Sequence, residues 1–163
     1  MTYYEIVKLI QQACENHKQV QSYGYGMLSN IQAPQVLQQR NYPYVFLNPT
    51  QHALTEHQIE YNFNLIIMDL ALSDDFKDQI NQNGTAQLFV QQEDTVLSAQ
   101  SGCLQIGLDI MAHFRYSSLG TDVVVQTSAV PFEERFDDTV SGMTLGLRII
   151  LPNPLSACEA IIV

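Results

Sequence analysis

The chain has 163 residues, of which 46% are hydrophobic and 15% charged, a composition typical of a single globular domain, here 1–163. Its formal net charge of −10, with seven scattered Lys and Arg residues, argues against a protein that wraps nucleic acid or binds a membrane surface. Three distant cysteines without a C-x-x-C pattern favour neither a disulfide framework nor a zinc site. We expect a soluble protein that folds in a cytoplasm, since no leader and no long apolar run is evident.

Residues from Thr2 to Val20 are predicted to form an amphipathic helix. Thr2, with Glu5 three residues later, matches a capping box. The next segment, Gln21 to Asn41, contains glycines and a proline and is predicted to be an ordered loop. The apolar residues of the helix recur at steps of three and four: Tyr3, Ile6, Val7, Ile10, Ala13 and Cys14.

Two strands are predicted to follow. The segment Tyr42–Pro49 is aromatic and β-branched and has a proline near each end, which favours a short strand near a sheet edge. After a polar connection, Gln51–His57, apolar and polar residues alternate from Ile59 to Ile67, the pattern of a half-buried strand. Four consecutive apolar residues, Leu65–Met68, indicate a bulge or burial on both faces.

The strongest helical periodicity runs from Thr95 to Arg115. Its apolar stripe is too broad for a solvated surface helix, so we expect this helix to lie across the sheet. The preceding apolar residues, Leu88–Val90, either extend the helix backwards or form an irregular lead-in. Gly102 and Gly107 are poor helix formers, which indicates close packing within the subunit or against a neighbouring one, or else a small kink.

A second pair of strands is predicted after this helix. The β-rich run Asp122–Val130 ends at Pro131, and a polar connection leads to the alternating run Met143–Leu151, which Pro152 stops. The predicted fold is therefore α+β in the order αββαββ. It has an antiparallel sheet of about four main strands, a long helix packed across it and an N-terminal helix.

No nucleotide-binding, zinc-protease or serine-hydrolase motif occurs in the sequence, so we expect no enzyme, no cofactor and no catalytic residues. His52, Glu56, His57 and Glu60 cluster in a predicted hairpin loop, but their spacing matches no recognised metal site, and a solvated loop is expected. Cys103 lies in the apolar stripe of the helix and is predicted to be a buried structural thiol.

An acidic group is predicted at the tip between the last two strands, where only Arg135 offsets the negative charge. Such a loop suits a subunit interface or a charge that faces a channel. A loop that is kept soluble by its charge is the alternative. The acidic residues are Glu133, Glu134, Asp137 and Asp138.

The order of elements and several local sequence patterns resemble virion neck and tail-completion proteins of tailed phages, especially structural proteins of crAss-like phages. The resemblance covers the chain from about Ser22 to Cys158. The segments that carry it are Tyr42–Pro49, Tyr61–Asp69, Ser101–Ile110 and Phe136–Gly142.

This resemblance implies a virion structural protein with a tail-terminator-like α+β fold. It would form a six-fold or twelve-fold homo-oligomeric ring in the head–tail connector or tail-completion region, between adjacent neck, portal or tail proteins. It would assemble in the host cytoplasm, without a membrane. DNA would pass through the ring without specific binding, and a net acidic lumen agrees with this because it weakly repels phosphates.

Subunits of a ring contact each other head to tail, and projecting loops and termini are the natural contacts with adjacent rings. The apolar end of the chain is a candidate contact, although it packs on its own domain in the alternative interpretation. The candidate contact segments are Gln51–Gln58, Pro131–Ser141, and the terminal residues Ile161, Ile162 and Val163.

A different class of function remains open from the sequence. The two hairpins and the helix could line a pocket of a small-molecule or peptide-binding module without catalysis, with the aromatic strand Tyr42–Phe46 as its wall. An enzyme is the third possibility.

Overall fold

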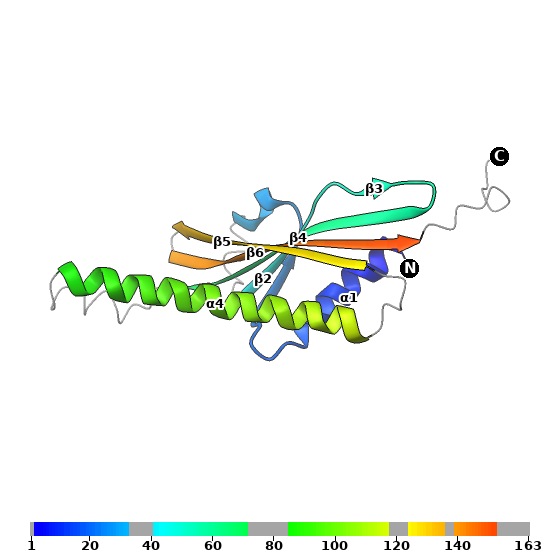
Figure 1. The fold of residues 1–163 in the computed structure, drawn as a ribbon. Helices are drawn as coiled ribbons and strands as arrows, with labels where there is room; N and C mark the ends of the chain where they lie inside the picture. The colour runs from blue at the N-terminus through cyan, green and yellow to red at the C-terminus, as the bar shows by residue number, and fades with distance from the viewer. Residues whose placement is uncertain (1, 33–40, 72–84, 118–123, 136–138, 153–163) are drawn as a thin grey trace.

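The computed structural model describes residues 2–32, 41–71, 85–117, 124–135 and 139–152 (Figure 1). Two α-helices, one 3-10 helix and six strands lie within these ranges. In chain order they are α1 (Tyr3–Glu15), β1 (Ser22–Tyr25), η1 (Leu28–Gln32), β2 (Tyr44–Pro49), β3 (Ala53–Leu54), β4 (Gln58–Leu70), α4 (Thr85–Ser117), β5 (Val124–Arg135) and β6 (Thr139–Pro152).

The strands form one mixed sheet in the order β1-β2-β4-β6-β5, and β3 pairs with β4. All pairs are antiparallel except β1 with β2. The predicted α+β class, the long helix and both antiparallel pairs are confirmed. The predicted antiparallel sheet of about four main strands is only partly confirmed, because β1 joins the sheet in parallel and β3 adds a short strand.

The capping box of α1 is confirmed. The Glu5 backbone N–H donates to Thr2 Oγ1 at 3.3 Å, and the Thr2 N–H donates to Glu5 Oε2 at 2.6 Å. These bonds satisfy two of the N–H groups that a helix start leaves unpaired. The helix ends at Glu15, before the predicted Val20, and the Asn16 N–H bonds back to Gln12 and Cys14.

Helices α1 and α4 cover one face of the sheet, and α4 runs along the strands (Figure 1). Between helices and sheet lies a continuous apolar core. A Cβ at Gly107 would lie 2.6 Å from a Leu145 methyl carbon, so this glycine lets α4 approach β6 closely. A Cβ at Gly102 would meet no atom within 4 Å, so close packing inside the subunit does not explain that glycine.

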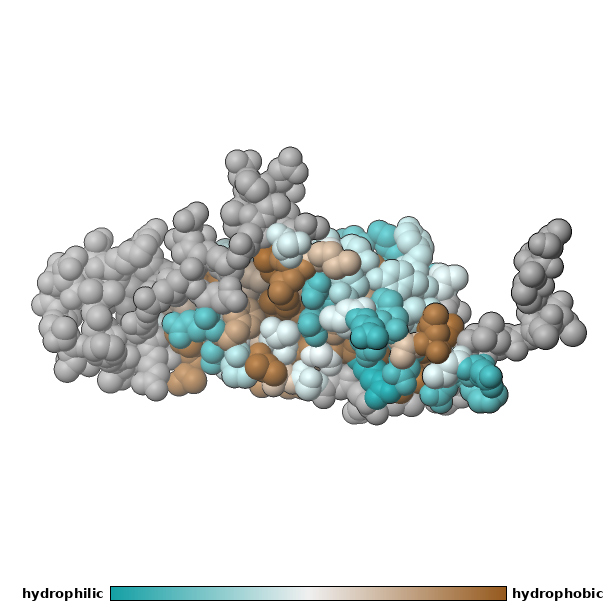
Figure 2. All heavy atoms as spheres, turned by 90° about the horizontal axis from the view of Figure 1, so that it is seen from above, coloured by the Kyte–Doolittle hydropathy of each residue, from teal (hydrophilic) through white to brown (hydrophobic). Residues whose placement is uncertain are grey.

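The opposite face of the sheet divides into an apolar part and a polar part. Ile31 of η1 packs there with Tyr44, Phe46, Ile66 and Met68. Leu65 and Ile67 point to the helix side, so the expected burial of β4 on both faces is confirmed. Figure 2 shows the face opposite α4, where hydrophilic atoms gather toward the end at which β6 leads to the C-terminus.

The segment Gln21–Asn41 was predicted to be a loop, and in its described part this is wrong. It contains β1 and η1. A Cβ at Gly24 would lie 2.1 Å from the Tyr44 hydroxyl, so this glycine makes room for a side chain of β2 and does not mark a turn. Because β2 lies directly beside the edge strand β1, the prediction that it lies near a sheet edge is confirmed.

The boundaries after residue 84 differ from the prediction in two places. Helix α4 begins at Thr85, so Leu88–Val90 belong to the helix, as one of the two alternatives had it. Pro131 does not end β5, which continues to Arg135. Because β5 is an edge strand, a residue without an N–H group can face away from β6 without losing a ladder hydrogen bond.

Candidate functional site

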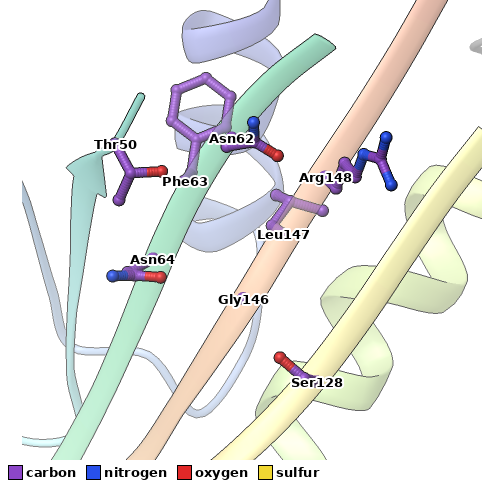
Figure 3. A pocket seen from close by; sticks show the side chains of 8 residues that line it. All are labelled: Thr50, Asn62, Phe63, Asn64, Ser128, Gly146, Leu147 and Arg148. Carbon is purple, nitrogen blue, oxygen red and sulfur yellow. The ribbon is translucent and has the colours of Figure 1, made fainter. Parts of the chain in front are cut away.

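A polar hollow of about 330 Å³ lies on the sheet face opposite the helices (Figure 3). Asn64, Gly146 and Ser128 are in register on β4, β6 and β5, so they form one row across its floor. Gly146 leaves the floor open, since a Cβ there would lie 2.8 Å from the Ser128 hydroxyl oxygen. The lining residues are Thr50, Asn62, Phe63, Asn64, Ser128, Gly146, Leu147 and Arg148.

One ion pair borders the hollow. Arg148 Nε donates to Glu60 Oε2 at 3.1 Å, and its terminal nitrogen donates to Glu60 Oε1 at 2.5 Å. The carboxylate therefore compensates the positive charge of the only ionisable side chain among the lining residues. Because those residues include no histidine, cysteine or carboxylate, the hollow offers hydrogen bonds to a ligand but no pair of groups for acid–base catalysis.

An aromatic cluster holds the connection between β2 and β3 against α1. The His52 ring lies 5.2 Å from Tyr3, 5.5 Å from Tyr61 and 5.6 Å from Phe63, measured between ring centroids. The Asn62 backbone N–H donates to His52 Nδ1 at 3.1 Å, which requires this nitrogen to be unprotonated. Burial lowers the pKa of His52, because the charged imidazolium would lose water.

The structure does not bring together the four metal-ligand candidates of the loop. His52 faces the aromatic cluster on the α1 side, whereas Glu60 pairs with Arg148. Glu56 and His57 are exposed in the turn, where Thr55 Oγ1 accepts from the Gln58 N–H at 3.0 Å. Within the described ranges no three His, Cys, Asp or Glu side chains are placed to hold a metal ion.

The two candidate contact segments with described residues, Gln51–Gln58 and Pro131–Ser141, lie at opposite ends of β6. At one end, Gln58 pairs with Pro152, so the β3–β4 hairpin and the start of the C-terminal segment are neighbours. At the other end, Glu133 pairs with Ser141. The 14 residues of β6 separate these ends by about 45 Å at 3.4 Å per residue.

The acidic group is only partly described. Glu133 is exposed, and it lies in β5 together with Glu134, so both belong to a strand and not to the predicted connecting loop. The prediction that Pro131 ends the strand and that a polar connection follows is wrong as far as Arg135, because β5 pairs with β6 up to that residue. Asp137 and Asp138, and the terminal Ile161, Ile162 and Val163, lie outside the described residues.

The two described cysteines are buried in the core. Burial raises the pKa of both the Cys14 and the Cys103 thiol to about 12, since the thiolate would lose its solvation. The Cys103 thiol lies 4.0 Å from the Ser141 carbonyl oxygen, to which it donates. This environment keeps the thiol protonated, as expected for a structural cysteine.

The sequence did not single out the polar residues of the hollow. Asn62, Asn64 and Arg148 occupy the polar positions of two alternating strands, a pattern that equally describes a solvated face. What distinguishes this face is the alignment of Asn64, Gly146 and Ser128 across three strands, which depends on register.

No protein-family model and no curated protein matches the chain. No helix in the parts of the chain that the structure describes is long and apolar enough to cross a bilayer.

Proposed function

We propose that this protein is a virion structural subunit that forms a homo-oligomeric ring in the head–tail connector or tail-completion region of a tailed phage. In this proposal it is not an enzyme. It acts as a geometric adaptor around the DNA channel, with six or twelve copies of a tail-terminator-like fold. The resemblance of the sequence to neck and tail-completion proteins supplies the class of function.

The observation that carries the proposal is the placement of the projecting segments at opposite ends of β6. A ring that joins two other layers needs one contact surface on each side. The β3–β4 hairpin, which carries the exposed Leu54, lies at one end, and the β5–β6 hairpin with Glu133 lies at the other. One long sheet holds both in fixed relation, as an adaptor requires.

The net charge of the chain also supports a channel through which DNA passes without being held. Tight binding of phosphates requires uncompensated Lys or Arg side chains. Arg148 is paired with Glu60, and the chain as a whole carries a charge of −10. The phosphate backbone would meet weak repulsion and slide.

Sedimentation of the purified chain tests this function. The proposal expects a discrete species of six or twelve times 18.4 kDa, in equilibrium with the monomer at low concentration. Reversing the charge of Glu133, Glu134, Asp137 and Asp138 should preserve the mass of this species and lower the yield of infectious particles. A strictly monomeric chain whose charge-reversed form supports normal particle yield would contradict the proposal.

The hollow at Gly146 favours a second candidate function, that of a small-molecule or peptide-binding module. Its neutral amide and hydroxyl groups suit hydrogen bonds to a peptide backbone. Gly146→Val would fill the floor, where even a Cβ approaches Ser128 Oγ to 2.8 Å. If the module is the function, a peptide library should contain ligands that raise the melting temperature of the wild-type chain but not of this variant.

A further inference from the structure

The ladder of hydrogen bonds along one side of β4 is interrupted between β2 and β3. Strand β2 pairs with β4 as far as Phe63, and β3 pairs with β4 only up to Glu60. Among the described residues, no strand pairs on this side with the two β4 residues between them, Tyr61 and Asn62. The Asn62 backbone N–H donates instead to Nδ1 of the His52 side chain at 3.1 Å. The His52 ring therefore takes the place of a backbone carbonyl group in the interrupted ladder.

His52 is also the one packed residue of the segment Gln51–Gln58. The other seven residues of this segment are exposed, including both residues of β3. The His52 ring, in contrast, is half-buried against Tyr3 of α1 and against Tyr61 and Phe63 of β4. A two-residue strand with exposed side chains buries too little apolar surface to hold a hairpin in place. The position of the β3–β4 hairpin therefore depends largely on His52.

Asn62 makes a second hydrogen bond to the same segment. Its side-chain Nδ2 donates to the Gln51 carbonyl oxygen at 2.8 Å. Because Gln51 precedes His52 directly, a displacement of the His52 ring would also disturb this bond. We call the His52 ring, with its contacts to Asn62 and to the three aromatic rings, the His52 anchor.

A proton on Nδ1 of His52 is incompatible with the His52 anchor. The protonated imidazole has a donor at both nitrogens, so Nδ1 can no longer accept from the Asn62 N–H. Two N–H groups would then face each other across 3.1 Å. The charged ring would also lose hydration, and this burial lowers the pKa of His52.

The titratable groups that face the His52 ring are two phenols, those of Tyr3 and Tyr61. The Tyr3 hydroxyl shares a hydrogen bond of 2.9 Å with the Tyr25 hydroxyl of β1. Phenols are uncharged between pH 5 and pH 8, so they do not compensate an imidazolium charge there. The charged or titratable side chains elsewhere on α1, β4 and the hairpin have other surroundings: Glu5 bonds to Thr2, Lys8 and Glu15 to Gln11, Glu60 to Arg148 and Asp69 to Leu70, and Glu56 and His57 are exposed.

We propose that His52 is a proton-operated anchor of the β3–β4 hairpin. The neutral ring holds the segment Gln51–Gln58 against β4 and α1, and a proton on Nδ1 releases this segment while β4 stays paired with β6. The inference goes beyond the proposed ring function and does not depend on it. The hairpin carries the exposed Leu54 and is a candidate contact segment, so its release in acid would loosen a contact that is made there.

Amide hydrogen exchange of the full chain, measured by NMR between pH 7.5 and pH 5, tests this inference. The protection factor corrects for the intrinsic effect of pH on exchange. For the Asn62 amide it should fall about tenfold per pH unit between the ordinary histidine pKa of about 6.5 and the lower pKa of folded His52, because the released segment binds the proton more readily. In dilute urea the Asn62 value should not change, since release exposes little surface, whereas the protection of Leu65 in the core should fall.

The variants His52→Phe and His57→Phe alter two histidines of the same hairpin segment. Phenylalanine at position 52 keeps an aromatic ring in the cluster but removes the acceptor and the proton. The Asn62 protection factor should therefore be roughly 10-fold lower than in the wild type at pH 7.5 and independent of pH. His57 is exposed, so His57→Phe should keep the pH dependence of the wild type. If His52→Phe folds poorly, the wild-type titration still decides the question.

Three results would overturn the inference. If the Asn62 protection factor stays constant while His52 takes up its proton, the charged ring remains in place. A folded pKa of His52 at or above about 6.5 would mean that the aromatic rings stabilise the imidazolium and that acid strengthens the contact. If Asn62 and Leu65 have equal protection and respond equally to urea, the hairpin is released only when the whole chain unfolds.

Discussion

Both sides of α4 carry apolar residues, but these residues have different surroundings. Ile106 and Ile110 face the sheet and are buried in the core, whereas Leu97 and Leu108 lie on the flank and are exposed. Burial of an apolar side chain stabilises the fold only where another part of the same subunit covers it. The difference shows that the broad stripe of this helix contains one part that stabilises the subunit and another that the described part of the subunit leaves exposed.

Substitution on the two sides of α4 should give the largest difference in stability. Ile106→Ala leaves a cavity in the core and should lower the free energy of unfolding by about 2–5 kcal/mol. Leu108→Ala, on the flank, should change it by less than about 0.5 kcal/mol in the monomer. Urea denaturation at a concentration below assembly measures both. Equal losses would show that the flank belongs to the core of the subunit.

The two glycines of α4 should respond to alanine with opposite signs. Gly107→Ala places a methyl group against buried Leu145, and overpacking of this kind costs about 1–3 kcal/mol. Gly102→Ala meets open space and should stabilise the subunit by about 1 kcal/mol, because alanine favours helix. Thermal and urea unfolding of the two single variants measure the signs. A destabilising Gly102→Ala would mean that the surface around Gly102 is covered within the subunit.

The smallest expected effect concerns two histidines, His52 beneath α1 and the exposed His57. Because burial lowers the pKa of His52 in the folded state, the unfolded chain binds its proton first as the pH falls. Stability should therefore be complete above the unfolded pKa of about 6.5 and decline as the pH falls toward the folded pKa. Urea midpoints between pH 8 and pH 5 should show this decline in the wild type and in His57→Phe, and less of it in His52→Phe. An equal decline in His52→Phe would assign it to other groups.

The helices and strands that could be predicted from the sequence are those whose pattern depends only on residues close together in the chain. The capping residues Thr2 and Glu5 determine where α1 begins, and alternation in Ile59–Ile67 predicted β4, because both patterns depend on neighbouring residues alone. Strand β1 escaped prediction because four residues with a central Gly24 show no usable periodicity, and only pairing with β2 makes them a strand. The prediction that Pro131 ends β5 also failed because it depended on a non-local feature. A proline is tolerated within β5 since β5 is an edge strand.

The candidate surfaces were harder to predict than the elements. Exposure of Leu97 or Met27 depends on which neighbours the chain folds against them, and hydrophobicity alone made Leu97 appear to be a core residue. The hollow at Gly146 depends on the register of three strands.

Electron cryomicroscopy of the intact particle that contains this chain tests the central claim most directly. The account predicts a ring of six or twelve copies between portal and tail, with the β3–β4 hairpin facing one adjacent layer and the β5–β6 hairpin facing the other. A particle without this chain, or with single copies that form no ring, would contradict the account.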